Sequence, residues 1–322
     1  MRGLVVKLDR GYPLVKDAQG REIRCEYATT LVKGSRVRAT TGDAVEFSVP
    51  EGHDKGIIDQ VFARRNAFVR KDPAERSLPQ VLAANFDKVF VVEPLVNLNV
   101  RRLERELVLA HESGADVQVL LTKADLADDE KALESAKMLV ERVAQGTEVL
   151  VVSDQDAESV EAVRAAVRPG EVAVLLGKSG VGKSSLVNVL VGKDIQATGA
   201  VRERDGRGRH TTVSREMVDI PGGGRVIDMP GVRGLALWDA DEGMGAAFAD
   251  IEALAETCRF GDCRHDGEPG CAVEAAVARG DVAAERLESY RRLKAETDEA
   301  KRRREESRRI RSRKGHPRRW QG

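Results

Sequence analysis

The segment from Gly177 to Ser185 constrains the fold of this chain more than any other. It reads Gly-Lys-Ser-Gly-Val-Gly-Lys-Ser-Ser, after an apolar strand expected at 172–176 and before a helix expected at 186–191. This is the P-loop pattern in its strand–loop–helix context, where backbone N–H groups hold phosphate oxygens at a helix N-terminus. A chance glycine-rich turn could match the bare pattern, but it would not need those flanks. We therefore expect a phosphate-binding α/β fold.

Every residue of this loop is a candidate for phosphate binding. Lys183 is expected to reach the β- and γ-phosphates, and Ser184 to ligate Mg²⁺. The full set is Gly177, Lys178, Ser179, Gly180, Val181, Gly182, Lys183, Ser184 and Ser185.

A second motif, Thr122-Lys-Ala-Asp125, indicates which base is bound. A carboxylate at Asp125 can accept from both N1–H and N2–H of guanine, a contact that adenine does not offer, and the Lys123 stem can pack over the purine. Ser153 ends the next expected strand, where a backbone contact to guanine O6 would fit. The quartet alone could be an exposed strand end, and an ATP-dependent P-loop enzyme remains a competing interpretation. Combined with the P-loop, the pattern favours GTP.

The order of these motifs is unusual. The guanine box at residue 122 precedes the P-loop at residue 177, which precedes Asp228-Met-Pro-Gly231. In ordinary GTPases the P-loop comes first. A circular permutation explains the order, because spatial positions survive when the chain ends are relocated. Asp228 is expected to hold Mg²⁺ through water, and the Gly231 N–H to face the γ-phosphate.

The glycine- and arginine-rich segment 206–212 is expected to be a switch. Such a segment needs a threonine hydroxyl on Mg²⁺; we choose Thr212, with Thr211 as the second choice. Val232 follows Gly231 where many GTPases have a water-orienting glutamine. His210 is the candidate replacement, although it could instead contact a partner. Intrinsic hydrolysis is therefore expected to be slow, and an activating partner is implied.

Three cysteines and a histidine cluster late in the chain, in contrast to the isolated Cys25. The set Cys258, Cys263, His265 and Cys271 is typical of a closed, structural zinc site. Buried free cysteines are the alternative, but the glycines and proline between the ligands provide the turns that a zinc knuckle needs.

The balanced charge of the chain hides three regions. The 53 basic and 53 acidic residues sum to zero, which taken alone argues against a nucleic-acid partner. However, residues 301–322 hold 11 Lys/Arg and 2 Asp/Glu, and residues 1–72 hold 14 and 10, whereas residues 73–300 hold 28 and 41. The basic ends could attract RNA. No apolar stretch approaches the ~20 residues of a membrane-spanning helix, and no signal peptide is recognised at the start. We expect a cytoplasmic protein without a membrane contact, and nothing demands more than a monomer.

The first 65 residues show short strands and turns about ten residues apart, a rhythm typical of a small sandwich or barrel. The expected strands are Leu4–Leu8, Ile23–Tyr27, Ser35–Ala39, Ala44–Val49 and Gly56–Val61. From about residue 86, apolar strands alternate with helices, which indicates a parallel α/β sheet. After about residue 240 the chain is expected to be helical, with Leu287, Tyr290 and Leu293 on one buried face.

These motifs together resemble the circularly permuted, small-subunit-dependent GTPases of bacteria (the RsgA type), over nearly the whole chain. The resemblance rests on Ala84-Asn-Phe-Asp87, the guanine box, the P-loop, the 206–212 segment, Asp228-Met-Pro-Gly231 and the zinc spacing. It implies an OB-fold β-barrel, a central permuted P-loop GTPase domain and a C-terminal helical zinc-binding domain, with His210 catalytic. Two departures are Thr122, where asparagine is commoner, and Asp154 after Ser153.

The resulting prediction is a multidomain α/β protein that binds GTP with Mg²⁺ and one structural Zn²⁺. Its expected function is GTP hydrolysis in late maturation of the small ribosomal subunit, with that subunit and its rRNA as partners and the subunit as activator. An RNA-binding module with a vestigial nucleotide site is the alternative. The expected regions are the OB-fold domain 1–68, the GTPase domain 69–238, the zinc domain 239–300 and the basic tail 301–322.

Overall fold

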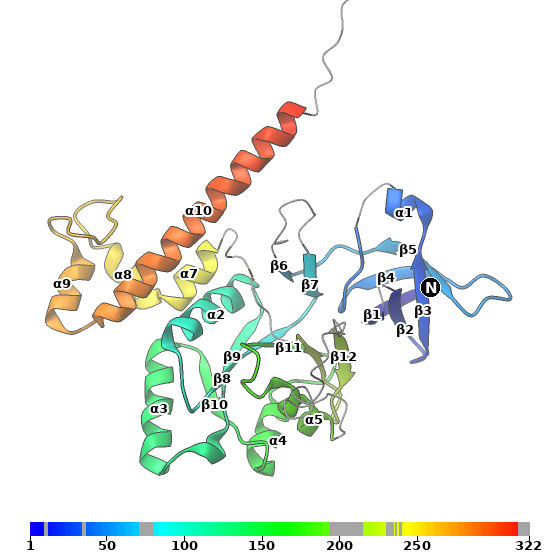
Figure 1. The fold of residues 1–322 in the computed structure, drawn as a ribbon, viewed down its shortest axis with the longest axis horizontal. Coiled ribbons are helices and arrows are strands. Elements are labelled where there is room, and N and C mark those ends of the chain that lie inside the picture. The colour runs from blue at the N-terminus through cyan, green and yellow to red at the C-terminus, as the bar shows by residue number, and fades with distance from the viewer. Residues whose placement is uncertain are drawn as a thin grey trace, which may run out of the picture. The chain divides into compact units, whose positions relative to one another are not determined.

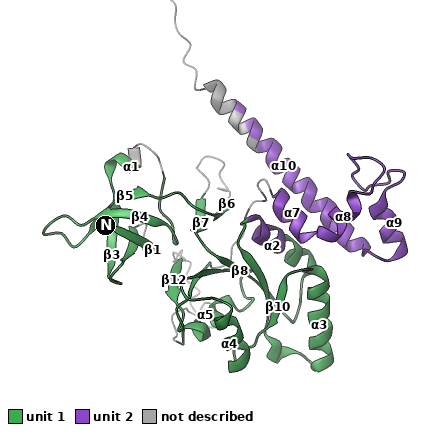
Figure 2. Ribbon diagram, turned by 180° about the vertical axis from the view of Figure 1, so that it is seen from behind, with its two compact units in different colours: residues 1–106, 113–235 green, residues 107–112, 236–322 purple. Residues whose placement is uncertain are grey.

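The computed structural model describes residues 1–9, 12–33, 37–70, 80–192, 215–229, 235, 237 and 240–314. The chain divides into two compact units, 1–106 with 113–235, and 107–112 with 236–322 (Figure 2). In the described part of the chain, no helix combines the length and the apolar character needed to cross a membrane.

A closed five-stranded barrel forms the start of the first unit (Figure 1). Its strands are β1 (Arg2–Asp9), β2 (Tyr12–Asp17), β3 (Glu22–Tyr27), β4 (Ala44–Ser48) and β5 (Gly56–Val61), with the short helix α1 (Thr29–Lys33) after β3. The order is β1-β2-β3-β5-β4, and a pairing of β4 with β1 closes the ring. The core of the barrel is small, and Phe47 is the one aromatic side chain among its described buried residues. These residues are Val5, Val15, Cys25, Ala39, Val45, Phe47 and Ile58.

The second barrel strand differs from the sequence expectation. β2 occupies residues 12–17, where no strand was expected, and it contains Pro13 and Asp17, which are poor strand formers. Both side chains nevertheless point inward with Val15, and Asp17 accepts hydrogen bonds from the backbone N–H groups of Gln19 and Arg21 at 2.9 Å each. Asp17 is buried because it closes the turn into β3.

The strand expected at 35–39 is wrong where it can be checked. Residues 37–39 belong to no strand. They lead into a tight turn in which the Asp43 carboxylate accepts from Thr40 N at 2.8 Å. Asp43 is itself held by the Arg64 guanidinium at 2.7 Å, so this segment serves as a corner of the barrel rather than a ladder strand.

The rest of the first unit is built on a sheet ordered β10-β9-β8-β11-β13-β12. The strands are β8 (Lys88–Pro94), β9 (Asp116–Thr122), β10 (Glu148–Val151), β11 (Val172–Leu176), β12 (Glu216–Asp219) and β13 (Arg225–Asp228). All pairings are parallel except β12 with β13. At the edge, β12 also pairs with β1 of the barrel through Lys7 and Glu216, whose side chains form an ion pair at 2.7 Å. A separate hairpin, β6 (Ala67–Arg70) with β7 (Gln80–Ala84), connects barrel and sheet.

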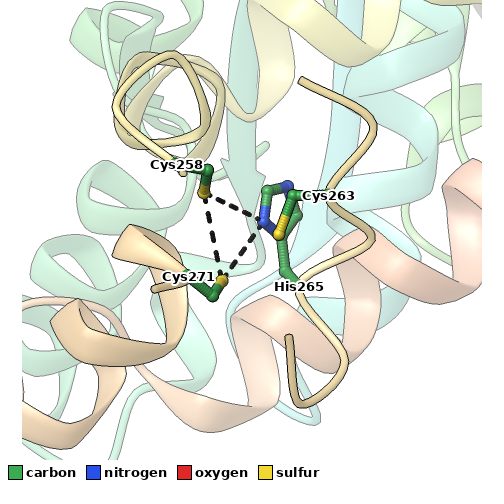
Figure 3. Close-up of side chains that lie close together, drawn as sticks. All are labelled: Cys258, Cys263, His265 and Cys271. Carbon is green, nitrogen blue, oxygen red and sulfur yellow. Dashed lines mark hydrogen bonds between the residues drawn. The ribbon is translucent and has the colours of Figure 1, made fainter. Parts of the chain in front are cut away.

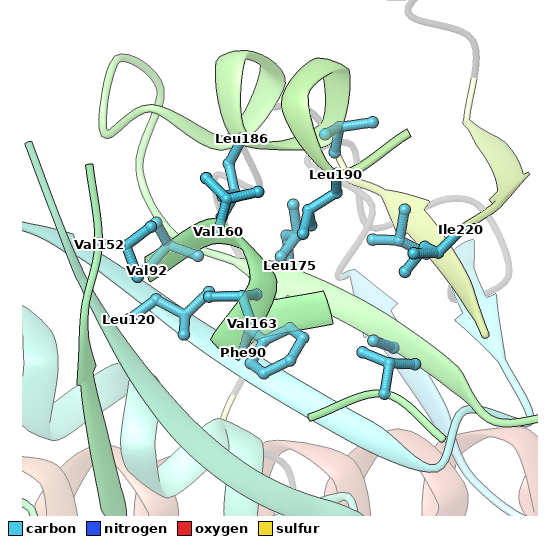
Figure 4. Close-up of a cluster of buried hydrophobic side chains, with 14 of the residues drawn as sticks. Phe90, Val92, Leu120, Val152, Val160, Val163, Leu175, Leu186, Leu190 and Ile220 are labelled. Carbon is cyan, nitrogen blue, oxygen red and sulfur yellow. The ribbon is translucent and has the colours of Figure 1, made fainter. Parts of the chain in front are cut away.

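Helices cover this sheet and bury its apolar strands. They are α2 (Val100–Glu112), η1 (Ala124–Leu126), α3 (Glu130–Val143), α4 (Ala157–Ala165) and α5 (Lys183–Val191). Leu175 of the central strand packs with Leu186 and Leu190 of α5 and with Val160 and Val163 of α4 (Figure 4). The core is built from Val and Leu with few aromatic rings, as the composition implies, and it fixes the start of α5 above the end of β11.

The second unit is helical. Its helices are α7 (Asp241–Ala247), α8 (Ala249–Ala255), α9 (Ala272–Arg279) and α10 (Ala284–Lys314). The predicted apolar face of α10 is confirmed, since Leu287, Tyr290 and Leu293 are all at most 6% exposed. Arg286 adds a two-pronged ion pair to Asp250 of α8, both contacts at 2.7 Å.

The fold prediction is confirmed: an N-terminal barrel, a P-loop sheet with permuted strand order and a helical C-terminal region with a Cys₃His cluster. The predicted domain limits at residues 68, 238 and 300 stay predictions. The basic segment 301–314 continues α10 as a helix.

Candidate nucleotide site and metal cluster

The P-loop joins β11 to α5 in the geometry that the sequence predicts. Gly182 caps α5 with a φ of 103°, a backbone conformation that favours glycine. A Cβ on Gly177 would lie only 2.6 Å from the Val92 carbonyl oxygen of the adjacent strand β8. Both positions therefore require glycine, one for its conformation and one for close approach.

Lys183 lies inside the loop with little exposure to solvent. It is 5% exposed, and its Nζ donates to the carbonyl oxygens of Gly177 at 2.5 Å and Lys178 at 2.9 Å. The ammonium is thus fixed against the loop backbone at the start of α5, beside the N–H groups that would hold phosphate.

The guanine box contacts the P-loop directly, although it lies about 55 residues earlier in the chain. Thr122 Oγ1 donates to Val181 O at 2.6 Å, and Lys123 Nζ donates to Gly180 O at 3.0 Å. The Thr122 hydroxyl therefore ties the end of β9 to the phosphate loop.

Asp125 is oriented by two neighbours. Its Oδ1 accepts from Ser153 Oγ at 2.9 Å, and its Oδ2 lies 3.4 Å from Gln155 Nε2. The sequence reading gave Ser153 a backbone contact to guanine, but its N–H donates to Ser159 Oγ at 3.2 Å. That reading stays a prediction, while the Ser153 side chain has a positioning role that was missed. The sequence signal for this role was the position of Ser153 just after β10, the strand that pairs with β9, which precedes Asp125.

The remaining predicted ligands divide between described and undescribed residues. Asp228 ends β13, is 1% exposed, and lies at the same sheet edge as the P-loop because β13 runs parallel to β11. Ser184 lies in the first turn of α5. A buried carboxylate and a hydroxyl are oxygen donors of the kind Mg²⁺ prefers. His210, Thr211, Thr212 and Gly231 lie outside the described residues.

The Thr122 contact gives a direct test of how the guanine box is held. Thr122→Val keeps the volume and removes the hydrogen bond to Val181 O. One such bond is worth roughly 1 kcal/mol, so guanine-nucleotide affinity is expected to fall about fivefold. Titration of a fluorescent GDP analogue measures this. Thr122→Ser, which retains the hydroxyl, is the control, and an unchanged affinity in the valine variant would contradict the role.

A separate cluster brings together Cys258, Cys263, His265 and Cys271 in the second unit (Figure 3). One potential ligand atom from each lies within 4.8 Å of all the others. His265 Nδ1 is 3.6 Å from Cys258 Sγ and 3.4 Å from Cys271 Sγ. Burial lowers the pKa of His265, which favours the neutral imidazole that ligates metals. The four predicted ligands can therefore hold one metal ion.

Neighbouring backbone shapes this cluster. The Cys271 sulfur caps α9 by accepting from Glu274 N at 3.4 Å, and the Cys258 sulfur accepts from Ala272 N at 3.3 Å. The Glu268 carboxylate accepts from the N–H groups of Arg264 and Asp266, which closes the loop around His265. The sulfurs of Cys258 and Cys271 are thus fixed at the N-terminus of α9.

The P-loop, the Thr122–Asp125 motif that contacts it and the order of their strands define a class, the circularly permuted P-loop GTPases. The model of the family described as RsgA GTPase matches residues 61–238. The small ribosomal subunit biogenesis GTPase RsgA of Streptomyces avermitilis is 45% identical over 294 residues, covering 91% of this chain and 78% of the relative. Its counterpart in Streptomyces coelicolor is 46% identical over 295 residues, covering 91% and 80%. The chain belongs to the RsgA GTPase family, whose members are GTP-hydrolysing enzymes.

Solved structures agree with this assignment. The crystal structure of YjeQ from Thermotoga maritima has a TM-score of 0.68 and 27% identity, and covers 91% of this chain and 96% of its own. That of YloQ, a circularly permuted GTPase, has a TM-score of 0.65 at 22% identity, covering 93% and 96%. The YloQ likeness concerns the fold alone.

Proposed function

We propose that this chain is a GTP-hydrolysing assembly factor that acts in late maturation of the small ribosomal subunit and is stimulated by that subunit. The observation that carries the proposal is the joined site, in which Thr122 and Lys123 contact the P-loop and Asp125 is held for guanine. The printed names of the relatives supply the biological setting. We infer that the protein works as a monomer in the cytoplasm.

Within this proposal, GTP binds with Mg²⁺. Ser184 and Thr212 are the proposed ligands, with Thr211 as the second choice, and Asp228 acts through a water. The ion offsets charge on the β- and γ-phosphate oxygens. Lys183 contacts the same phosphates, and Asp125 selects guanine over adenine.

We propose rRNA as the contact of the barrel on the basis of one exposed aromatic group. Tyr12 is 42% exposed, with the Arg24 guanidinium 5.9 Å and the Lys55 ammonium 5.8 Å from its ring centroid. Phe47, by contrast, is fully buried in the core. A ring flanked by cations suits base stacking combined with phosphate contact.

We further propose that the Cys₃His cluster holds one structural Zn²⁺. At a Zn–S length of about 2.3 Å, tetrahedral sulfur ligands lie about 3.8 Å apart. The sulfurs of Cys258 and Cys271 are 4.0 Å apart, which supports a site of this size. Four protein ligands leave no position open for catalysis.

The decisive experiment is GTP turnover with and without purified small subunits. We expect slow turnover alone and at least tenfold stimulation by the subunit. His210→Ala is expected to retain GTP binding and lose the stimulated turnover, while His53→Ala, an exposed histidine outside the nucleotide site, serves as the control for intrinsic turnover. Absence of stimulation in the unaltered protein would sink the proposal and favour an RNA-binding module with a vestigial site.

A further inference from the structure

Four charged side chains lie together behind the P-loop, and three of them were not recognised from the sequence. Glu93 comes from the end of β8, Arg102 and Glu106 from α2, and Lys183 from α5. Glu93 is fully buried, Glu106 is 9% exposed and Lys183 is 5% exposed. The two carboxylates and the Lys183 ammonium are therefore almost removed from water, while the Arg102 side chain is 21% exposed.

The backbone explains why these groups meet. β8 runs parallel to β11, with Val91 paired to Leu176, so Glu93 lies level with the residues that open the P-loop. Arg102 and Glu106 are four residues apart on α2 and therefore share one face of the helix. The Val92 carbonyl, one residue before Glu93, is already in close contact with Gly177.

Within this group the two carboxylates differ in their hydrogen-bond partners. Arg102 grips both oxygens of Glu93, with Nε 2.6 Å from Oε1 and Nη2 on Oε2. Oε2 of Glu106 is buried and has no hydrogen-bond partner in the described part of the chain. Buried carboxylate oxygens without donors strongly favour the protonated, neutral form.

The charged groups that act on Glu106 are Glu93 from β8, Arg102 from its own helix and Lys183 from α5. Burial and the neighbouring Glu93 carboxylate raise the pKa of Glu106 to about 8, against the opposing effect of the two cations. At neutral pH the group then carries Glu93⁻, Arg102⁺ and Lys183⁺, a net single positive charge beside the phosphate loop. Ionisation of Glu106 cancels that charge.

We propose that Glu106 is a positioning residue for Lys183 that makes nucleotide binding proton-linked. When Glu106 is neutral, the ammonium of Lys183 is available to the phosphates; when it is ionised, its carboxylate competes with them for the ammonium. This inference rests on the proposed guanine-nucleotide function of the same site.

The direction of the linkage follows from charge. A bound nucleotide brings negative charge close to Glu106 and further favours its protonated form, so binding takes up a proton. Affinity is expected to be highest below pH 8 and to weaken above it, by at most about tenfold per pH unit. Below pH 7 Glu106 is already protonated in the free protein, so it contributes no further change in nucleotide affinity.

The test compares GDP affinity of the full-length protein from pH 6.5 to 9 with that of Glu106→Gln. The unaltered protein is expected to lose about five- to tenfold in affinity between pH 7.5 and 9. The glutamine variant, which mimics the neutral acid, is expected to match it at pH 7 and to show a flat profile. Titration of the nucleotide itself is common to both proteins and cancels. Glu134→Gln, an exposed site on α3, is the matched control and is expected to keep the slope.

A second measurement does not depend on the variant folding. In a weakly buffered indicator solution at pH 8, binding of GDP to the unaltered protein is expected to take up about half a proton. A flat affinity profile with no proton uptake overturns this inference alone, as does a glutamine variant that keeps the slope. Failure to bind guanine nucleotides at any pH overturns the proposed function as well, so the two failures are distinguishable.

Discussion

Replacing Lys183 by alanine is expected to reduce GTP affinity by about two orders of magnitude. The side chain is nearly buried, and its ammonium donates to two loop carbonyl oxygens. On nucleotide binding it is expected to exchange these for charge-assisted bonds to phosphate, worth about 1.5–3 kcal/mol each. Lys183 is the loop side chain predicted to reach the β- and γ-phosphates, so its removal is expected to cost these contacts.

Isothermal titration with GTP and GDP measures this loss. Lys131→Ala, an exposed lysine on α3, removes the same charge from the chain and is expected to bind normally. Thermal unfolding without nucleotide controls for damage to the fold. If Lys183→Ala bound GTP within a factor of three of the unaltered protein, the assignment of this loop to triphosphate binding would be wrong.

Cys271→Ser is expected to remove the metal and unfold the part of the second unit around residues 256–280. Structural zinc sites contribute apparent binding free energies of about 10–16 kcal/mol, comparable with the whole stability of a domain. Serine is a good helix N-cap, so it can replace the bond that the Cys271 sulfur accepts from Glu274 N. Any loss of structure in this variant therefore reports the loss of the metal and not the loss of the helix cap.

Metal content by plasma mass spectrometry is expected to fall from one zinc per chain to less than 0.1, with new protease cleavage in the 258–271 loop. Cys25→Ala provides the control, since Cys25 lies in the barrel core, far from the cluster in sequence and in the other compact unit. It is expected to retain one zinc. A fully folded, metal-free Cys271→Ser protein would show that the cluster is only a group of buried thiols.

The parts of the site that the sequence predicts well are those with short, fixed spacing. The P-loop glycines and the Cys₃His set are local patterns whose geometry depends on a few consecutive residues, and both assemble as expected. The guanine box was found for the same reason. Its proximity to the P-loop could be expected only by assuming that a circular permutation leaves the spatial positions of the strands unchanged.

What the sequence could not predict depends on contacts between distant residues. Strand β2 was missed because its last residue, Asp17, is polar and yet buried. Its carboxylate accepts from two backbone N–H groups of the following turn, a role that residue type alone does not reveal. Glu93 and Glu106 were not singled out from the sequence, because their burial depends on the pairing of β8 with β11 and on the packing of α2. His210 and Thr212 remain sequence predictions, because they lie outside the described residues.

The strand order of the sheet explains why a relocated chain break is tolerated. β8, β9 and β10 are contiguous in sequence and adjacent in the sheet, and so are β11, β12 and β13, which leaves a single seam between β8 and β11. The permutation exchanges the synthesis order of the two strand sets without altering the pairing inside either. The proposed nucleotide site straddles that seam, with Thr122 and Lys123 on one side and the P-loop on the other. On this proposal, a bound nucleotide is expected to link the two strand sets and to stabilise the folded sheet by an amount that grows with the logarithm of its concentration.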